Sequence, residues 1–453
     1  MGALDRSKVL VVGAGVSGLS AAVLAAERGA SVELVEGEQA IGGLLQGHRF
    51  RDVDCDLGSH RLHRAALEHP VVARLVGRID LRRRPRRGVL LLGGLRIPYP
   101  PSWLDLARGL SASGPRFAAS FVLRRERLIG WERARLDDLD EDLGFSRFVR
   151  ARVGDAAFEA FYRPYVEKVW GLDADQVSQT VAKARVSTTA PLSLIASGLG
   201  RRLARAFGRE HRPGEFLYPR LGMSTLVEDL RARAEALGVV IRRGVRFDPR
   251  APRQADVVLH SGKLADLTPR ALGHRGVYLV YLALPLARVD RFETYYTPEA
   301  RFWFGRVSEL ANYAPALSRP GETILCVEIP EGRWGEGRRF DRAPELRELL
   351  GQLRRAEILP PNVEPLEVSQ RFVRDVYPLY VRGWAREWGA ALDDVARLGG
   401  VLPFGRQGLY LHCNIDQCMA MALDVVDHVD AARSFEAWRA HARGVLLGVR
   451  VRD

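Results

Sequence analysis

The stretch that decides the fold is residues 8–36, KVLVVGAGVSGLSAAVLAAERGASVELVE. The apolar run over residues 8–12 is typical of a strand buried on both faces, and residues 31–35 repeat the pattern. Between them lie the glycine-rich sequence GAGVSG (residues 13–18) and a run of good helix formers that ends at Gly29. This order predicts a strand, a helix and a second strand, the first unit of a nucleotide-binding α/β fold.

The glycines of GAGVSG have separate roles in such a unit. Gly13 permits the tight turn out of the strand, Gly15 lets the backbone approach a pyrophosphate, and Gly18 lets the helix pack close to the sheet. The phosphates would bind free amides at the helix N-terminus. Glu36 lies 18 residues after Gly18, where its carboxylate can accept hydrogen bonds from a ribose diol. We therefore predict a dinucleotide site rather than a structural glycine turn.

Length and composition point to a globular protein with more than one domain. The chain has 453 residues, of which 47% are hydrophobic and 27% charged, so a largely disordered protein is excluded. The net charge is +13, but all except four of the 68 basic residues are arginine, a bias that a GC-rich genome can produce without any anionic partner. The densest run, residues 82–87, has no interleaved aromatic residues, and we interpret it as a solvated loop rather than a nucleic-acid or lipid patch.

The four cysteines, Cys55, Cys326, Cys413 and Cys418, fit neither a zinc spacing nor a disulfide framework. We interpret them as small buried apolar residues in a reducing compartment. A strand beginning by Val9 leaves no room for a signal peptide, and the longest apolar stretches are far too short to span a membrane. We expect a cytoplasmic protein that binds no nucleic acid, while peripheral membrane contact and oligomeric state stay open.

Beyond Glu36 the sequence becomes more specific. A Gly42-Gly43 pair is followed by a strand-like segment, residues 49–55, and then by a D-x-G-x-H sequence that ends at His60. Together with GxGxSGLxxA, these elements resemble the FAD-dependent amine oxidase and protoporphyrinogen oxidase superfamily, whose relatives include phytoene desaturases and UDP-galactopyranose mutases. The resemblance implies that the Gly-Gly segment passes the flavin pyrophosphate and ribityl chain, and that His60 sits beside the flavin ring. The basic residue that usually follows the glycines is replaced by Leu44-Leu45.

No metal site is predicted in this part of the chain. Asp52, Asp54 and Asp56 alternate, which places them on one strand face that we interpret as solvated. His60 and His63 lack a cysteine or carboxylate cluster that would complete a ligand set.

The middle of the chain carries a predicted helical insertion, residues 100–150, and an aromatic helix end over residues 161–178 with a stop at Gly171. The K-x-W-G sequence there, with Arg185 after it, resembles a segment shared by protoporphyrinogen oxidase-like proteins and the mutases. In the mutases a proline and a second arginine follow, whereas this chain has VSTT over residues 186–189, which disfavours a mutase.

A second block, FLYPRLGMSTL over residues 216–226, precedes a helix that we expect Ser224 or Thr225 to cap. A strand over residues 239–247 should follow. The superfamily has a very similar block, and the resemblance places Val245 against the adenine.

Later strands should build a second sheet. Residues 255–260 are expected to return to the nucleotide domain, whereas 276–284, 303–313 and 323–329 predict a mixed or antiparallel sheet over the flavin.

Arg306 and Asn312 match positions typical of the protoporphyrinogen oxidase-like group. Arg306 could bind substrate or form a structural salt bridge, and it joins His60 as a candidate catalytic residue.

The carboxy-terminal sequence LPFGRQGLYLHCNIDQ, residues 402–417, predicts a strand that ends at Gly405-Arg406 and a helix that begins around residues 414–416. Free amides and the positive helix end would suit flavin N1 and the C2 carbonyl. The pattern closely resembles the mutases and their oxidase relatives, although Asn414 and Asp416 could act only as helix caps.

The predicted fold is α/β, with a Rossmann-like FAD-binding domain of the glutathione-reductase-2 type and a mixed-sheet substrate domain that includes the helical insertion. The FAD domain is assigned to residues 1–63, 216–264 and 396–453, and the substrate domain to 64–215 and 265–395. The predicted FAD contacts are Gly13, Gly15, Val16, Ser17, Gly18, Glu36, Gly42, Gly43, Gly58, Ser59, His60, Val245, Gly405, Arg406, Asn414, Ile415, Asp416 and Gln417.

Three functions follow from this reading. The first is an FAD-dependent oxidoreductase that takes hydride from a C–H bond of a small molecule onto flavin N5. No second strand-linked GxGxxG is present, so we expect oxygen or a quinone as acceptor. The alternative is a non-redox mutase of the UDP-galactopyranose type, in which reduced flavin attacks a sugar carbon. A binding protein that has lost its flavin, as in Rab escort proteins, is disfavoured by the intact glycines.

Overall fold

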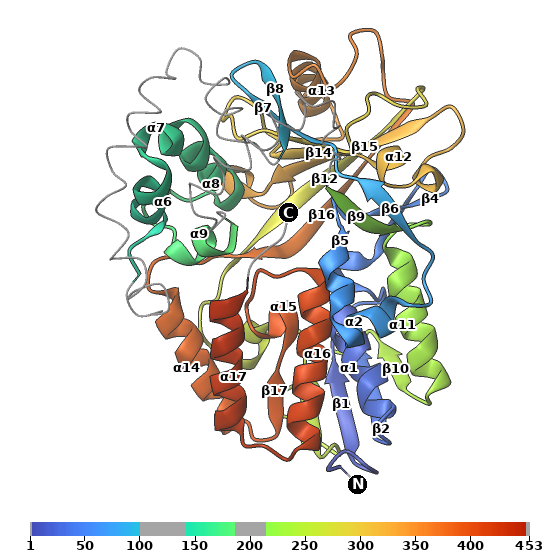
Figure 1. Cartoon of the computed structure of the whole chain (residues 1–453), viewed down its shortest axis with the longest axis vertical. Helices are drawn as coiled ribbons and strands as arrows, with labels where there is room; N and C mark the ends of the chain where they lie inside the picture. The colour runs from blue at the N-terminus through green and yellow to red at the C-terminus, as the bar shows by residue number, and fades with distance from the viewer. Residues whose placement is uncertain (1, 100–141, 186–213, 450–453) are drawn as a thin grey trace, which may run out of the picture.

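The computed structural model describes residues 2–99, 142–185 and 214–449 (Figure 1). Most of the predicted helical insertion, and the sequence VSTT over residues 186–189, lie outside the described residues. The boundaries proposed above for the two domains stay predictions.

The first layer is a five-stranded, all-parallel sheet whose strands come from three separate parts of the chain. Its order is β10 (Val240–Arg243), β2 (Ser31–Glu36), β1 (Lys8–Val12), β11 (Val257–His260) and β17 (Val401–Pro403). The predicted βαβ unit is therefore present, and β10 is shorter than the strand expected over residues 239–247. Because parallel strands all end at one edge, the loops after β1, β2 and β11 meet there.

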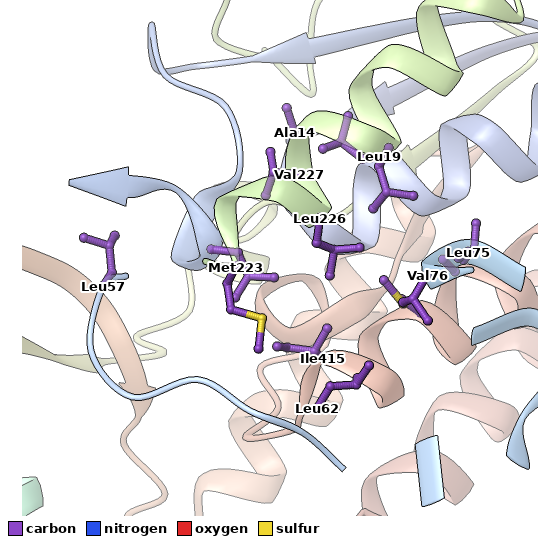
Figure 2. Packing of buried hydrophobic residues seen from close by; sticks show 14 of the residues in the cluster. Ala14, Leu19, Leu57, Leu62, Leu75, Val76, Met223, Leu226, Val227 and Ile415 are labelled. Carbon is purple, nitrogen blue, oxygen red and sulfur yellow. The ribbon is translucent and has the colours of Figure 1, made fainter. Parts of the chain in front are cut away.

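Three helices cover one face of this sheet. Helix α1 (Val16–Ala26) packs between α11 (Ser224–Ala236) and α16 (Ile415–Asp430), as Figure 1 shows. Nine consecutive residues of α1 are buried because the helix has the sheet on one side and helices on the others. Figure 2 shows Leu19 of α1 close to Leu226 and Val227 of α11, all within one hydrophobic cluster that also contains Ile415.

The second layer is a seven-stranded sheet with one parallel pair, β13 with β7, among antiparallel neighbours. The expectation of a mixed sheet is confirmed. The strand order is β16 (Glu367–Pro378), β12 (His274–Leu284), β15 (Thr323–Pro330), β14 (Arg306–Glu309), β13 (Thr294–Tyr296), β7 (Gly88–Leu92) and β8 (Leu95–Tyr99).

The strand expected over residues 303–313 is shorter than predicted. It is limited to β14, and the chain then turns into the short helix α12 (Leu310–Tyr313).

Two small sheets connect the layers. One is the hairpin of β3 (Gly47–Phe50) and β4 (Val53–Asp56). The other has the order β5 (Leu62–His63), β9 (Glu215–Pro219) and β6 (Leu81–Pro85). The arginine-rich run predicted as a loop thus begins as an edge strand, because alternate side chains can stay in solvent while the backbone pairs with β9.

The remaining longer helices lie around the two sheets: α2 (Pro70–Val76), α6 (Phe145–Val153), α8 (Arg163–Trp170), α9 (Gln179–Arg185), α13 (Glu345–Arg355), α14 (Trp384–Arg397) and α17 (Phe435–Gly448). The predicted stop after α8 is confirmed, since Gly171 takes a left-handed conformation with φ +65°. In the part of the chain that the structure describes, no helix combines the length and apolar character needed to cross a bilayer.

Candidate functional site

A large cavity lies where the loops of the parallel sheet meet the seven-stranded sheet. Its empty volume is about 1110 Å³, including the part open to solvent. Its walls come from α1 (Val16), the short helix η1 (Gly43–Leu45), residues 57–63, strands β12, β13, β14, β15 and β16, and residues 406–418. Segments that are far apart in the sequence therefore face one space.

The glycine-rich loop leaves β1 through Gly13, which has φ +93°, and enters α1 after Gly15. A side-chain carbon on Gly18 would lie 1.8 Å from the Gly13 carbonyl oxygen, so packing alone demands glycine there. Gly15 differs, because φ −76° suits any residue and a side-chain carbon would meet nothing within 4 Å. The protein itself thus leaves open space before the helix N-terminus, where a phosphate fits.

Glu36 closes β2 beside this loop. Its Oε2 accepts a hydrogen bond of 2.7 Å from the Ala14 amide, and its backbone oxygen accepts one of 2.8 Å from the Val245 amide. Val245 is 40% exposed. The structure thus brings the predicted ribose and adenine residues together at the sheet edge, outside the cavity.

The Gly-Gly segment joins the glycine-rich loop to the cavity. Gly42 pairs with Gly15 in an isolated bridge and donates its amide to the Ala14 oxygen at 2.8 Å. Leu44 and Leu45, the residues found where a basic side chain was expected, line the cavity. A continuous path therefore runs from the glycine-rich loop to the cavity wall.

Asp56 corrects the expectation of a solvated aspartate face. Asp54 is exposed, whereas Asp56 is only 3% exposed and accepts hydrogen bonds from the Met223 amide (3.0 Å) and the Tyr218 hydroxyl. Burial raises the pKa of Asp56 to about 6. The strand leads into the interior at this point, so its last carboxylate is enclosed.

The capping prediction for α11 is wrong. The N-cap is Met223, without a side-chain cap bond, and the Thr225 hydroxyl donates instead to the Gly222 oxygen at 2.6 Å.

An ion pair between partly exposed Arg306 and buried Glu328 fixes the segment that carries His60. Glu328 Oε1 accepts from Arg306 Nε at 2.7 Å, and Oε2 accepts from Arg306 Nη2 at 2.6 Å. The Ser59 amide also donates to Glu328 Oε1, at 3.0 Å. Burial alone would lower the pKa of Arg306, but the Glu328 carboxylate raises it well above its usual value. Arg306 thus forms the salt bridge and also lines the cavity.

Asn312 has a structural position away from this cavity. Its amide nitrogen donates to the oxygens of Asp290 (3.0 Å) and Phe292 (2.8 Å) and to Glu309 Oε2 (2.9 Å).

His60 lies on the cavity wall beside two guanidinium groups. Its Nδ1 is buried, and the ring lines the cavity. Burial, with the charges of Arg306 and Arg406, lowers the pKa of His60 to about 4. The ring is therefore neutral at physiological pH, and a ligand in the cavity can bond to it.

Arg61 is a cavity residue that the sequence reasoning missed. Its side chain is 7% exposed, and Nη2 donates to Glu293 Oε1 at 3.1 Å, Thr294 Oγ1 at 2.8 Å and Tyr313 Oη at 3.1 Å. The available signal was an arginine between two histidines of one short segment.

The C-terminal motif is partly rearranged relative to prediction. The strand ends at Pro403, and Gly405 begins the short helix α15 (Gly405–Gly408). Gly405 has φ +75°, and a side-chain carbon there would lie 2.5 Å from Ser17 Oγ. The backbone bends at this point because α15 packs against the start of α1.

Arg406 supplies positive charge to the cavity. Its Nη1 donates to the Cys413 oxygen at 2.7 Å and its Nη2 to the Val376 oxygen at 2.6 Å. Its Nε is buried without a hydrogen-bond partner, and the partners given for its other nitrogens within the described ranges are carbonyl oxygens, not carboxylates. A carbonyl oxygen does not neutralise a guanidinium, so this charge stays available to a bound group.

Helix α16 begins as predicted, with Asn414 as its N-cap. Asn414 and Gln417 form a capping box, in which the Asn414 amide donates to Gln417 Oε1 at 2.9 Å. Asn414 and Ile415 line the cavity, whereas Asp416 and Gln417 do not. The capping role and the cavity position therefore coexist at Asn414.

The predicted cofactor residues thus divide by position, and their cofactor roles stay predictions. Those on the cavity wall are Val16, Ser59, His60, Arg406, Asn414 and Ile415. Further wall residues that no motif indicated are Arg61, Tyr296, Glu328, Tyr377, His412, Cys413 and Cys418. Most of these come from strands or lie between motif positions, so only the fold brings them to the site.

Comparisons with known proteins agree with this architecture. Residues 11–79 match the family described as NAD(P)-binding Rossmann-like domain. A segment of 184 residues, 39% of this chain, is 24% identical to protoporphyrinogen oxidase 2 of Arabidopsis thaliana and spans only 35% of that protein. The match thus covers about a third of the curated relative.

Among solved structures, the fold is similar to reduced UDP-galactopyranose mutase over 98% of both chains, with a TM-score of 0.79 and 17% identity. It is also similar to putrescine oxidase bound to putrescine, with a TM-score of 0.59 and 16% identity over 94% of this chain and 99% of that one. These likenesses confirm the resemblance stated from the motifs and the predicted α/β fold with a Rossmann-like domain.

Proposed function

We propose that this chain binds FAD with its isoalloxazine ring in the cavity, and that it is a flavin-dependent oxidoreductase for a small molecule. One observation carries the proposal. The glycine-rich loop, the Gly-Gly segment, the D-x-G-x-H segment and the C-terminal helix start were each assigned to FAD separately, and all four contribute to one cavity or to the path into it.

Two features favour a flavin over a nicotinamide in the cavity, although the matched Rossmann-like family is described for NAD(P). A flavin ring needs donors and positive charge near N1 and the C2 carbonyl, where negative charge gathers on reduction. The N-terminus of α16 and the Arg406 guanidinium both lie on this wall. Leu44, Leu45 and Val277 supply apolar surface for a flat ring.

The protein residues have distinct roles in this proposal. The bound flavin would accept hydride from a substrate C–H bond. Neutral His60 cannot act as a cationic acid near pH 7 because its pKa is about 4, so it hydrogen-bonds and helps exclude water. Arg306 is oriented by Glu328 and offers its remaining donors to substrate. No side chain needs to serve as a base.

A second candidate, a non-redox sugar-nucleotide mutase, is favoured by the full-length likeness in fold to a mutase. The guanidinium groups of Arg61, Arg306 and Arg406 on one wall would also suit a diphosphate.

The deciding experiment is the visible spectrum of the purified protein, followed by anaerobic dithionite, air and candidate substrates. We expect an oxidised flavin spectrum that bleaches with a C–H donor and recovers in air. Turnover of a sugar nucleotide by reduced enzyme alone, without net consumption of reductant, would establish the mutase instead. A protein that cannot be loaded with flavin would refute both.

Arg406→Gln tests the charge assignment. We expect flavin to bind but its reduced form to lose about 1.5–3 kcal/mol of stabilisation, the value of one hydrogen bond to a charged group. Arg374→Gln, at an exposed pair with Glu336, is the matched control and should leave the potential unchanged.

A further inference from the structure

Two thiols face each other in the cavity wall. The Sγ atoms of Cys413 and Cys418 are 3.6 Å apart, and each residue is only 4% exposed. Both line the cavity beside Asn414 and Ile415. The cysteines flank the start of α16, with Cys413 before the N-cap and Cys418 as the fourth helical residue.

The other two cysteines have different surroundings. Cys55 lies in β4 and Cys326 in β15, and neither lines the cavity. Burial raises the pKa of both thiols, which makes them inert. Close pairing next to the cavity is therefore specific to Cys413 and Cys418 among the four cysteines.

The surroundings of the pair make Cys418 the more easily ionised thiol. The hydrogen bond with Cys413 lowers the pKa of Cys418 against the opposing effect of burial, and the charge of Arg406 and the Ser17 hydroxyl lower it further. The start of α16 adds positive potential at the same place. The same hydrogen bond and burial raise the pKa of Cys413, so Cys413 keeps its proton. Disulfide formation begins at the thiol that ionises more readily, which in this pair is Cys418.

We propose that Cys413 and Cys418 form a reversible dithiol–disulfide pair that exchanges two electrons with the flavin in the same cavity. In oxidation, two S–H bonds break and one S–S bond forms. Two protons and two electrons leave, and oxidised flavin takes them up as it is reduced. The role of flavin as the electron acceptor rests on the function proposed above, whereas formation of the disulfide between Cys413 and Cys418 does not.

The geometry requires little movement. A disulfide needs the sulfurs about 2.05 Å apart, so the present separation of 3.6 Å must close by side-chain rotation. Cys413 precedes the helix, and its side chain is therefore not restricted by a helical turn.

The first test needs no flavin. The full-length protein is equilibrated with a series of reduced and oxidised glutathione ratios, then alkylated under denaturing conditions and digested with trypsin. Both cysteines fall in the peptide of residues 407–433, because no lysine or arginine lies between Arg406 and Arg433. We expect this peptide to become two hydrogens lighter and resist alkylation at oxidising ratios, while Cys55 and Cys326 are fully alkylated. Full alkylation of the peptide at every ratio would overturn the proposal.

The second test measures exchange with the flavin. In an anaerobic dithionite titration, the oxidised holoprotein should take up about twice the electrons of the Cys413→Ser variant, since each two-electron couple adds equally. Cys326→Ala, away from the cavity, should match wild type, and circular dichroism checks that both variants fold. Uptake by wild type equal to Cys413→Ser, with the disulfide present, would refute exchange. If no flavin binds, the proposed function fails, yet a disulfide in the 407–433 peptide still supports the pair.

Discussion

The two parts of the site are built from different chemical groups. Around the glycine-rich loop, which is proposed to hold the phosphates, glycine turns, backbone amides and one carboxylate come from residues 13–43, and open space is left in front of Gly15. On the cavity side, the guanidinium groups of Arg61, Arg306 and Arg406 come from separate elements and are held by carboxylates or carbonyls. A backbone site is encoded locally, whereas a site of buried charges depends on the whole fold.

The largest effect is expected from Gly15→Val, which tests the backbone side. The conformation of Gly15 accepts any residue, and nothing in the protein lies within 4 Å of a new side-chain carbon. The variant should fold with an unchanged melting temperature when no cofactor is bound, because only a phosphate needs that space. We expect its affinity for FAD to fall at least about 1000-fold, or about 4 kcal/mol. Equilibrium dialysis measures the affinity.

The matched control is Gly37→Ala, at a glycine without positive φ whose side-chain carbon would lie 3.6 Å from Arg246. It should bind FAD normally. Normal binding by Gly15→Val would mean that the phosphates lie elsewhere.

Next in size is Arg306→Met, which tests the cavity side. It leaves the Glu328 carboxylate, 6% exposed, without its partner, and we expect a loss of about 3 kcal/mol in the free energy of unfolding. Adding Glu328→Gln should recover much of that loss, because no unpaired charge remains. Urea unfolding of the single and double variants measures both values.

The control is Arg374→Met, at a pair whose side chains are 69% and 51% exposed. Its loss should be below about 1 kcal/mol. Equal losses in the free energy of unfolding for Arg306→Met and Arg374→Met would mean that burial does not make the cavity ion pair more important than a surface ion pair.

The third effect depends on pH and comes from Asp56. Its usual pKa of 3.8 is raised to about 6 in the folded protein, so the folded state binds more protons between those values. The contribution of Asp56 to the free energy of unfolding is therefore greatest below pH 3.8, and it is lost as the pH rises through about 6. As pH rises across this range, Asp56→Asn should therefore gain stability relative to wild type, by about 3 kcal/mol in total. Urea unfolding between pH 4 and pH 7.5 measures the difference.

His60→Gln checks the sign. The folded pKa of His60 is lowered from 6.5 to about 4, so its contribution is present above pH 6.5 and is lost as pH falls toward 4. The stability of His60→Gln relative to wild type should therefore increase as pH falls, whereas that of Asp56→Asn should increase as pH rises. Parallel curves for the two variants would contradict both assignments.

The smallest effect separates capping from cofactor contact at Asn414. Asn414→Ala should cost about 1 kcal/mol of stability through loss of the cap and should also shift the flavin absorption band, because Asn414 lines the cavity. Ser434→Ala removes the N-cap bond of α17, far from the cavity wall, and should lower stability without a spectral change. Identical spectra for the two variants would place the flavin away from α16.

The comparison also explains what could be predicted from the sequence. The βαβ unit and the roles of its glycines could be predicted because each of these residues contacts others that are close to it in the sequence, within one turn or strand. The prediction for Asp56 was wrong because strand periodicity shows which residues share a face but not what covers that face. Here the covering residues are Tyr218 and Met223, which lie 162 and 167 residues away in the sequence.

The residues of the cavity wall were harder to predict because they come together from segments that are far apart in the sequence. Glu328 and Tyr377 lie in strands with no motif, and their place follows only from pairing within the seven-stranded sheet. The cysteines illustrate a different limit. Composition correctly indicated burial, but a separation of 3.6 Å depends on how one loop enters one helix.

The capping box of α16 affects how the cavity wall tolerates amino-acid substitutions. The helix uses the Asn414 side chain for the amide of Gln417, and the first intrahelical bond uses the amide of Cys418. Of the four amides that open the helix, those of Ile415 and Asp416 are not used by the capping box or by the first intrahelical bond, and of these two residues Ile415 lines the cavity. A main-chain donor survives almost any replacement of its own side chain. Under the proposed function, recognition by the Ile415 amide would therefore tolerate replacement of the side chain at position 415, and a search for the site by conserved side chains would overlook this donor.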